Sequence, residues 1–566
     1  MTADLQQPTP RQLQDDAMSM KSWHLHGYAT LFITTTKVYY FYFSKDLATM
    51  YLSLITSVLL ASTASALPQR RQDAVNTTTC NGKTYEYLSL AGYGFTAPNS
   101  QDKFGDTAAG IGSSAAIDAK TWTLHDNGTY TGLLYALPDR GWNTEGTLNY
   151  QPRVHKFQIQ FDPASTGPSP NLQLHYLDTI RFSSDADVPF TGIDPNILPP
   201  YLTTSDGTTL PSATYEGDGF GGDGPGGSRP SLDSEGIVLM PDGTMYISDE
   251  YGDYIYHFAA DGKLITAIPP PEPFIPIRNG SVSFSAASPP RYDPDRETIP
   301  EDPDFGRVNN QGYEGLTGSP DGKYLYVLTQ SSLIQDGGAE GDELARWSRL
   351  VKLDLSASEG GVPPVVGQYV VPLPVYADED DELDVAAQSE IKYVSETQFL
   401  VMARDGNGWG QDETESKYRR ADVFDISGAT DVNGRQTVAP ESILADDIVV
   451  ATYCTFLDFN VNSELAKFGL QNGGDQDIGL LNEKWESLVL VPVQPAAAGQ
   501  WGQWTGKQDA NDEYFLFSLS DNDFITQDGY MNGGALPYSD ESGYDLLNQV
   551  LVFRVRLPAG AKPLTG

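Results

Sequence analysis

Residues 234–249 read SEGIVLMPDGTMYISD, and this stretch indicates the fold class. A Glu opens a short apolar strand, Pro-Asp-Gly at 241–243 signals a tight turn, and a second apolar strand ends in an acid. Farther along, 254–258 and 263–268 have the composition of two more strands around a turn at 260–262. Four consecutive antiparallel strands predict one blade of a β-propeller.

The Glu and its strand occur four times along the chain. The copies are spaced more widely than the usual blade period of roughly 40 to 50 residues, because of insertions such as 269–304 and 495–512. An earlier copy, without the Glu, runs through 112–117, 133–140 and 154–161. The four Glu residues are Glu235, Glu314, Glu390 and Glu486.

The two ends of the predicted domain are expected to close the ring. After Glu486 only three clear strands follow, the last at 550–555, and 85–90 is available as the missing fourth strand. Such closure removes the exposed edges of the sheets. We therefore predict an all-β protein, a β-propeller of four-stranded antiparallel blades, with five blades visible and a sixth left open.

Composition agrees with a turn-rich β protein and restricts its partners. The 566 residues include 55 Gly and 38 Pro, and 39% of them are hydrophobic. The 76 acidic residues exceed the 35 basic ones and give a net charge of −41. The negative electrostatic field repels nucleic acid and anionic membranes, so cations or neutral molecules are the favoured partners. The alternative is that the acidic surface only keeps the protein soluble.

The two cysteines, Cys80 and Cys454, exclude a disulfide-rich scaffold and a cysteine-based zinc site. In an oxidising compartment one bridge between them would join the N-terminal segment to a late blade and help to hold the ring closed. Two separate buried thiols are the alternative.

The N-terminal part predicts secretion. A signal peptide is expected at 50–66, starting near Met50 and ending in Ala64-Ser65-Ala66, and Arg70-Arg71 resembles a dibasic processing site ahead of a mature start near Gln72. Residues 1–49 are interpreted as an extension of the gene model. If Met1 is the true start, 47–67 would instead serve as a signal anchor.

These expectations divide the chain into 1–49, the signal peptide 50–66, a linker or pro-segment 67–82 and the propeller domain 83–560. The mature protein is expected to be extracellular, soluble and monomeric. Sequons for N-glycosylation begin at Asn76, Asn127 and Asn279.

Four segments carry a family resemblance: 229–236 (RPSLDSEG), 248–252 (SDEYG), 310–316 (NQGYEGL) and 138–141 (PDRG). At these residues the chain resembles the esterase-like phytase domain family, the phytase-like proteins common in fungi and bacteria, over roughly 87–558. The resemblance implies a propeller and hydrolysis of phosphate or carboxylic esters. The acidic and Asn-Asn signatures of calcium-dependent propeller phytases are not present in the sequence.

The repeat itself predicts an acidic site. Equivalent positions of successive blades converge on one face of a propeller, so the four Glu residues would form a carboxylate ring there. Gathered carboxylates need cations, and hard oxygen ligands favour Ca²⁺ or Mg²⁺. Structural pairing between blades is the alternative for this ring. The candidate metal ligands are Glu235, Glu314, Glu390, Glu486, Asp249, Glu250, Asp405 and Asp521.

Catalysis would fall to some of the same residues. Acids at strand ends could be ligands or could orient a water, or could simply cap turns; Asp139 and Asp523 belong to this group. Arg140, Arg229 and Arg404 could clamp an anionic ester oxygen or form structural ion pairs. The candidate catalytic residues are Glu235, Glu314, Asp249, Arg140 and Arg404.

Other chemistries have little support in the sequence. There is no Gly-x-Ser-x-Gly elbow, and His125, His155, His175 and His257 are scattered and expected on strand surfaces. The Gly- and Asp-rich stretch 216–224 is expected to be a flexible rim loop, with calcium binding as the alternative.

We therefore predict a secreted, metal-dependent hydrolase of a small-molecule phosphoester or related ester. A noncatalytic, calcium-stabilised binding propeller and a lactonase-like hydrolase are the alternatives, since the fold class cannot choose among them.

Overall fold

The computed structural model describes residues 74–338, 345–358, 361–378, 382–495 and 512–566. They belong to one compact unit, Gln72–Gly566. The expectations for the upstream segment, the signal peptide and the dibasic site lie outside the described residues. Within the described ranges, no helix is both long and apolar enough for a bilayer span.

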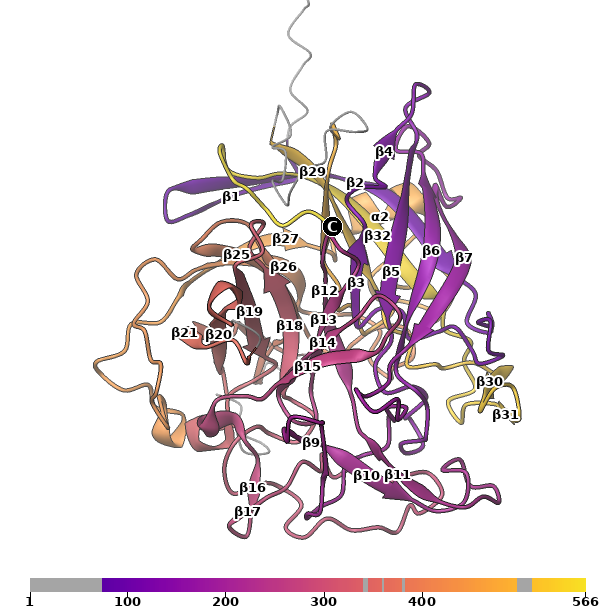
Figure 1. The fold of residues 1–566 in the computed structure, drawn as a ribbon. Coiled ribbons are helices and arrows are strands. Elements are labelled where there is room, and N and C mark those ends of the chain that lie inside the picture. Colours follow the sequence, from indigo (N-terminus) through magenta and orange to yellow (C-terminus); the bar gives the residue numbers. More distant parts are fainter. Residues whose placement is uncertain (1–73, 339–344, 359–360, 379–381, 496–511) are drawn as a thin grey trace, which may run out of the picture. The chain divides into compact units, whose positions relative to one another are not determined.

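Five antiparallel sheets form the blades of a β-propeller (Figure 1). In the first four blades the strands pair in chain order, as expected for consecutive hairpins, except that β4 pairs beside β3 on β5. Their strands are, for blade 1, β3 (Ser114–Ile117), β4 (Thr123–Leu124), β5 (Tyr130–Leu137), β6 (Arg153–Phe161) and β7 (Leu172–Arg181); for blade 2, β12 (Ser234–Leu239), β13 (Met245–Asp249), β14 (Tyr254–Phe258) and β15 (Leu264–Ile268); for blade 3, β18 (Tyr313–Gly318), β19 (Tyr324–Thr329), β20 (Trp347–Asp354) and β21 (Val365–Pro372); for blade 4, β24 (Ala387–Tyr393), β25 (Gln398–Arg404), β26 (Arg419–Asp425) and β27 (Thr452–Asp458).

Both ends of the domain build the fifth blade, as predicted. Its sheet has the order β1-β2-β32-β29-β28, and β2 pairs with β32 from Glu86–Arg556 to Thr96–Asn548. The expected five blades and the closure by the terminal strands are confirmed. The strands of this blade are β28 (Val489–Pro492), β29 (Glu513–Leu519), β32 (Asn548–Arg556), β2 (Lys83–Thr96) and β1 (Asn76–Cys80).

Short hairpins and helices fill the connections between the blades. Several of them, including β10–β11 and β16–β17, lie together on one side of the blades, at the bottom of Figure 1. The hairpin strands are β8 (Leu202–Thr203), β9 (Thr209–Leu210), β10 (Ser212–Tyr215), β11 (Gly227–Pro230), β16 (Ile277–Arg278), β17 (Ser281–Val282), β22 (Val375–Ala377), β23 (Leu383–Val385), β30 (Gly529–Met531) and β31 (Leu536–Tyr538). The helices are η1 (Glu272–Phe274), η2 (Ile334–Asp336), η3 (Leu355–Ala357), η4 (Pro440–Ser442), α2 (Asn462–Leu465) and η5 (Ala466–Phe468).

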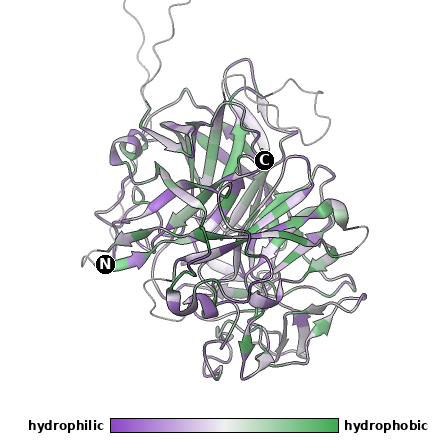
Figure 2. Cartoon of the chain, turned by 90° about the vertical axis from the view of Figure 1, so that its left-hand side faces the viewer, coloured by the Kyte–Doolittle hydropathy of each residue, from purple (hydrophilic) through white to green (hydrophobic). Residues whose placement is uncertain are grey.

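The hydrophobic core lies between neighbouring blades, whose strands carry hydrophobic residues among more polar ones (Figure 2). Between blades 1 and 5, Phe161 packs edge-on against Phe515 with ring centroids 5.1 Å apart. Between blades 3 and 4, Tyr326 packs against Phe399 at 4.9 Å. These aromatic contacts hold successive sheets face to face, which is what a ring of twisted blades requires.

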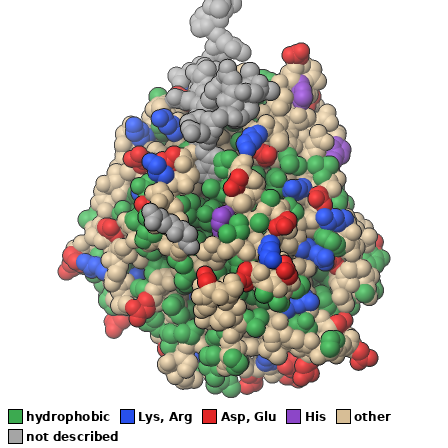
Figure 3. Space-filling view, in the orientation of Figure 1, with side chains coloured by type: hydrophobic (Ala, Val, Ile, Leu, Met, Phe, Trp, Pro, Cys, Tyr) green, Lys and Arg blue, Asp and Glu red, His purple; other side chains and the backbone are tan. Residues whose placement is uncertain are grey.

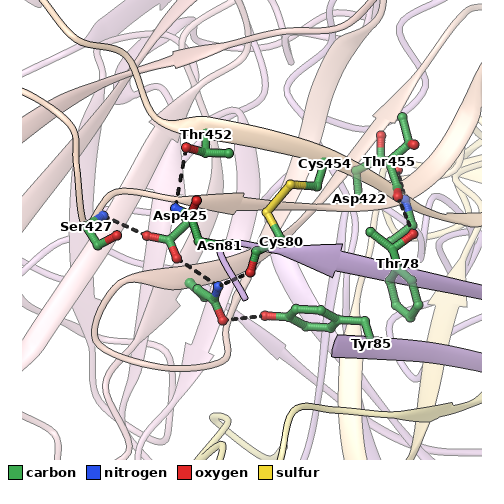
Figure 4. The surroundings of a disulfide bond; sticks show 12 residues. Thr78, Cys80, Asn81, Tyr85, Asp422, Asp425, Ser427, Thr452, Cys454 and Thr455 are labelled. Carbon is green, nitrogen blue, oxygen red and sulfur yellow. Dashed lines mark hydrogen bonds between the residues drawn. A yellow bond between two sulfur atoms is a disulfide. The ribbon is translucent and has the colours of Figure 1, made fainter. Parts of the chain in front are cut away.

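A disulfide joins the two blades that meet where the ring closes. Cys80 at the end of β1 bonds to Cys454 on β27, across a sequence separation of 374 residues (Figure 4). Gln398 at the start of β25 supports this junction, since it accepts a hydrogen bond from Tyr85 and donates to the Cys80 carbonyl. The blade 4 to blade 5 junction is therefore linked by both covalent and polar contacts.

The folded domain extends beyond the expected limits of 83 and 560. Strand β1 lies within the stretch assigned to a linker, because its backbone completes the edge of β2. At the other end Lys562 and Leu564 donate backbone hydrogen bonds to Val394 and Tyr393 of blade 4. The sequon residues Asn76, Asn127 and Asn279 are exposed, and their glycosylation stays a prediction.

A candidate acidic metal and active site

The first residues of the innermost strands are displaced by β-bulges. The pairing of β12 with β13 shifts between Ser234 and Gly236, and that of β18 with β19 shifts between Tyr313 and Leu316. A bulge leaves an extra residue out of the ladder and redirects its side chain. Glu235 and Glu314 occupy these extra positions, at the end of β12 and β18 that follows the inter-blade hairpins.

The glycine after each of these Glu residues allows the innermost strands to approach closely. A Cβ on Gly236 would lie 2.5 Å from the Leu316 Cβ, and a Cβ on Gly315 would lie 2.6 Å from the Ile391 backbone nitrogen. Real Cβ atoms do not tolerate such contacts. The Glu-Gly pair of the sequence therefore combines a redirected carboxylate with a close contact between neighbouring blades.

Three carboxylates meet beside β12. Asp233, Glu235 and Glu250 each have an oxygen within 4.8 Å of the others. Asp233 forms an ion pair with Arg140, whose Nη1 lies 3.1 Å from Oδ2. Burial and the nearby Asp233 raise the pKa of Glu250 to about 8, while burial and then Glu314 raise the pKa of Glu235 well above its ordinary value.

Glu314 and Glu486 extend the acidic cluster toward blade 5. Glu314 accepts a hydrogen bond from Gln330 through Oε1, and Arg404 donates to Glu486 Oε1 at 2.8 Å. Burial, followed by Glu250 and Glu486, raises the pKa of Glu314 well above its usual range, although Lys484 and Arg404 oppose the shift. Glu314 also raises the pKa of Glu235. The carboxylates beside β12 and those near blade 5 therefore form one electrostatic unit.

A second group of carboxylates surrounds Lys484. Its Nζ lies 2.8 Å from Asp523 Oδ1, 3.6 Å from Asp139 Oδ2 and 3.8 Å from Asp521 Oδ2. Burial lowers the pKa of Lys484, but Asp523, Glu486 and Asp521 raise it well above its ordinary value, so this lysine carries a charge. Burial raises the pKa of Asp521 to about 6.

Four buried carboxylate oxygens in this centre have no hydrogen-bond partner among the described residues. They are Asp233 Oδ1, Glu250 Oε1, Glu314 Oε2 and Glu486 Oε2. An unpaired oxygen of this kind is costly in a folded protein unless a water or an ion binds it. The donor set is made of hard oxygen ligands only, which fits Ca²⁺ or Mg²⁺.

Three predicted ligands have their oxygens occupied by the fold. Glu390 accepts from Ser114 Oγ at 2.6 Å and from the backbone amides of Leu316 and Ile391, and thereby ties blades 1, 3 and 4 together. Asp249 accepts from the amides of Asp233, Tyr251 and Gly252.

Asp405 likewise accepts from the amides of Asn407, Lys417 and Tyr418. These contacts favour structural roles for Glu390, Asp249 and Asp405, whose assignment as ligands stays a prediction. All three match the structural alternative, a blade-to-blade contact for Glu390 and turn caps for the two aspartates.

The arginines and histidines also separate by role. Arg140 and Arg404 lie in the acidic centre, each paired with a carboxylate, whereas Arg229 lies outside it and donates to Asn149. His155 is wholly buried rather than on a strand surface, bonded to Thr179. Burial lowers its pKa to about 3, so it stays neutral.

Sequence reasoning missed Asp233 and Lys484 as site residues. Each lies two positions before a repeat Glu, Asp233 before Glu235 and Lys484 before Glu486. Residues two apart in an extended segment point to the same side, so this spacing was an available signal. A bulge between the two positions weakens that rule for β12, where the ladder shifts between Ser234 and Gly236.

Comparison with known proteins gives a family and a relative. The model of the phytase-like family, described as esterase-like activity of phytase, matches residues 125–524. An uncharacterized secreted protein of Arthroderma benhamiae is 45% identical over 511 residues, which are 86% of this chain and 98% of that protein.

Solved structures align at low similarity. A PQQ-bound aldose sugar dehydrogenase from Streptomyces coelicolor is 12% identical with a TM-score of 0.24, and covers 83% of this chain and 100% of its own. An N-acetylgalactosamine deacetylase from F. plautii is 10% identical with a TM-score of 0.29, over 83% and 95%. Similarity at this level carries no inference about the chemistry of this chain.

Proposed function

Because this chain belongs to the phytase-like family, described by its esterase-like activity, we propose that it is a secreted hydrolase. It would cleave a phosphoester or related ester at its acidic centre, with the help of Ca²⁺ or Mg²⁺. The relative from Arthroderma benhamiae is itself described as a secreted protein. The observation that carries the proposal is the set of buried carboxylate oxygens in the centre that no described residue satisfies.

The charges of the centre support a bound cation. The carboxylates of the centre outnumber the basic side chains that act on them, which are Arg140, Arg404, Lys484 and Arg307. The excess negative charge is buried, where it repels itself strongly unless it is protonated or neutralised. The carboxylates are Asp139, Asp233, Glu235, Glu250, Glu314, Glu486, Asp521 and Asp523.

Asp233 and Glu250 would hold the ion, since each offers an unsatisfied oxygen and their carboxylates, with that of Glu235, have oxygens within 4.8 Å of one another. Glu314 and Glu486, each with an unsatisfied oxygen, would add negative charge beside them. When bound, Ca²⁺ or Mg²⁺ would polarise an ester oxygen and make a coordinated water more acidic. Glu235 would accept a proton from the attacking water, because it lies within 4.8 Å of Asp233 and Glu250 and a bound cation would offset the burial and the Glu314 charge that raise its pKa.

Arg140 and Arg404 would stabilise negative charge on the ester as it develops. Each guanidinium has a buried nitrogen, Nε, without a hydrogen-bond partner in the described part of the chain. Arginine donors placed before the reaction begins stabilise such charge without reorganisation. The pairing of each arginine with a carboxylate holds it in place for this role.

The test measures hydrolysis of p-nitrophenyl phosphate and p-nitrophenyl acetate by the purified protein, in EDTA and after return of Ca²⁺ or Mg²⁺. We expect turnover to disappear with EDTA and to return with the ion. Glu235→Gln should lower kcat by roughly 10²-fold or more, the usual loss for a general base. Glu297→Gln, at an exposed glutamate, is the matched control and should keep wild-type turnover.

Two results would contradict the proposal. Turnover that is the same in EDTA would remove the metal from the mechanism. A melting temperature that responds to Ca²⁺ without turnover of either ester would favour the binding propeller, in which the ion only stabilises the ring.

A further inference from the structure

A cleft of about 370 Å³ lies outside the acidic centre, between the loop that follows β10 and the ends of β6 and β7. Its volume is at the lower end of the range of about 300–1,000 Å³ for small-molecule pockets. Arginines, amides and aromatic rings line it together. The arginines and aromatic residues of this lining are Tyr150, Arg153, Arg181, Tyr215, Phe220 and Arg229.

Two of the three arginines lack a carboxylate partner in the described part of the chain. Arg153 is buried and paired with Asp102 at 2.6 Å and Asp106 at 2.9 Å, so its charge is compensated. Arg181 forms no ion pair with any described residue and lies over the Phe104 ring at 3.6 Å. Among the described residues, Arg229 donates only to the Asn149 amide oxygen, at 3.0 Å.

This arrangement is unusual in so acidic a protein. On the face shown in Figure 3, most basic side chains lie beside acidic ones. Arg153, Arg181 and Arg229 all line the same cleft. Burial and then the charge of Arg153 lower the pKa of Arg181, and Arg229 also lowers it, while Asp106 and Asp102 oppose the shift. Converging cations with unused donors favour a bound carboxylate or phosphate.

The loop between β10 and β11 also lines the cleft, and its flexibility, expected for 216–224, stays a prediction. Asp218 Oδ1 accepts from the amides of Phe220 and Gly222, and its Oδ2 accepts from Asn532. Gly219 has a positive φ of 78°, and a Cβ there would lie 2.5 Å from the Asn149 Cβ. Gly219 thus lets the loop approach Asn149 closely.

The remaining lining resembles a site for a polyhydroxylated ring. Tyr215 and Phe220 offer aromatic surface. The side-chain amides of Gln151 and Asn532 also line the cleft, with their nitrogens already bonded to Phe182 and Asp218. Arg229 lies 5.5 Å over the Tyr215 ring, which restrains its position. Aromatic faces combined with amides bind the apolar and hydroxylated sides of a sugar.

We propose that this cleft binds a singly charged sugar acid, with its carboxylate between Arg181 and Arg229 and its ring against Tyr215. Arg181 and Arg229 form no ion pair with a described residue, and Asp106 and Asp218 also line the cleft, so the site suits one negative charge rather than several. A polyphosphate would meet both those acids and the net charge of −41.

The test is calorimetric titration of the full chain with sodium D-glucuronate, D-glucose or inorganic phosphate. EDTA is present throughout, so that an ion in the acidic centre contributes nothing. We expect saturable binding of glucuronate and none of glucose at the same concentrations. Arg181→Gln and Arg229→Gln should each weaken glucuronate binding by about tenfold or more, since each removes a charge-assisted hydrogen bond.

Arg435→Gln is the matched control, because Arg435 is an exposed arginine paired with Asp447, and it should keep wild-type affinity. Arg181 is exposed, so its variant is expected to fold, and unchanged melting temperatures would verify this. Absence of glucuronate binding, or equal binding by Arg181→Gln and wild type, would overturn the proposal. Arginine-dependent binding of phosphate in preference to glucuronate would overturn the sugar-acid assignment.

Discussion

Glu235 and Asp422 are both buried acids whose surroundings disfavour the charged form. Burial and then Glu314 raise the pKa of Glu235, whereas burial alone is the main cause that raises the pKa of Asp422 to about 6. Glu235 lies among other carboxylates, and Asp422 lies on β26 bonded to Tyr418 and the Phe456 amide. The two residues therefore allow different tests.

Replacing Glu235 by Gln should stabilise the metal-free protein at neutral pH. The folded-state pKa lies above the ordinary value of 4.5, so ionisation of Glu235 destabilises the folded state once the pH exceeds about 4.5. The gain should grow with pH by at most about 1.4 kcal/mol per unit. Thermal melts in EDTA between pH 5 and 8 measure it.

With Ca²⁺ present, Glu235→Gln should lower the stability instead of raising it, because the variant has less negative charge to attract the ion. A lower melting temperature for Glu235→Gln in EDTA would instead indicate that the carboxylate pairs structurally with its neighbours.

Asp422 should make stability fall as the pH rises from about 4 to about 6. In this window the folded protein holds a proton on Asp422 that the unfolded chain has lost, so the free energy of unfolding decreases with pH. Relative to Asp422→Asn, the decrease should reach at most about 3 kcal/mol. Urea unfolding of both proteins at several pH values gives this difference, and a constant difference would contradict it.

At the scale of elements, the innermost strands depend on small residues. Gly236 on β12 faces Leu316 on β18 so closely that its absent side chain is part of the packing. The Ser248 hydroxyl also donates to the Glu314 carbonyl, which joins blade 2 to blade 3. The position of the Glu235 and Glu314 carboxylates follows from this contact.

Gly236→Ala should destabilise the protein by about 1–3 kcal/mol, the usual cost of overpacking a core. It should also reduce ester turnover if the two carboxylates work together, because β12 must move away from β18. The control is Gly167→Ala, where an added Cβ meets nothing within 4 Å. Chemical denaturation compares the variants, and equal stability of Gly236→Ala and wild type would contradict the prediction.

At the scale of the whole molecule, the ring is closed by strands from both ends of the domain. Thr78 and Asn76 on β1 donate to the carbonyls of Thr455 and Phe456 on β27, next to the disulfide (Figure 4). The bond between Cys80 and Cys454 therefore restrains the junction of blades 4 and 5, where the last blade meets its neighbour.

Removal of this disulfide by Cys80→Ser with Cys454→Ser should lower stability by about 2–5 kcal/mol, since a long loop loses its cross-link in the unfolded chain. Thermal melts with and without dithiothreitol measure the effect. Reductant should lower the melting temperature of the wild type and leave the double variant unchanged. Equal melting of wild type and double variant would show that β1 holds the junction without the bond.

The blades themselves could be predicted from the sequence because their determinants are local. Alternating apolar residues and Pro-Asp-Gly turns such as 241–243 define hairpins within a few residues. The strand at 85–90, which no blade had yet used, was predicted to pair with 550–555, and it does. The repeated Glu residues were also identified from the sequence repeat. The sequence therefore determined the fold class, the ring closure and the candidate acids.

Only the tertiary structure decided which acids have unsatisfied oxygens. The sequence repeat aligns Glu314 with Glu390, yet the bulge of β24 leaves out Ser389 and pairs Glu390 with Met402. Glu390 is bonded to Ser114 of blade 1, while Glu314 keeps one oxygen without a described partner. Likewise, Lys484 and Asp139 are far apart in the chain but 3.6 Å apart in the folded protein. Hydrogen bonds and charge pairs depend on neighbours from other blades, and a local pattern contains no information about which neighbour the closed ring brings near.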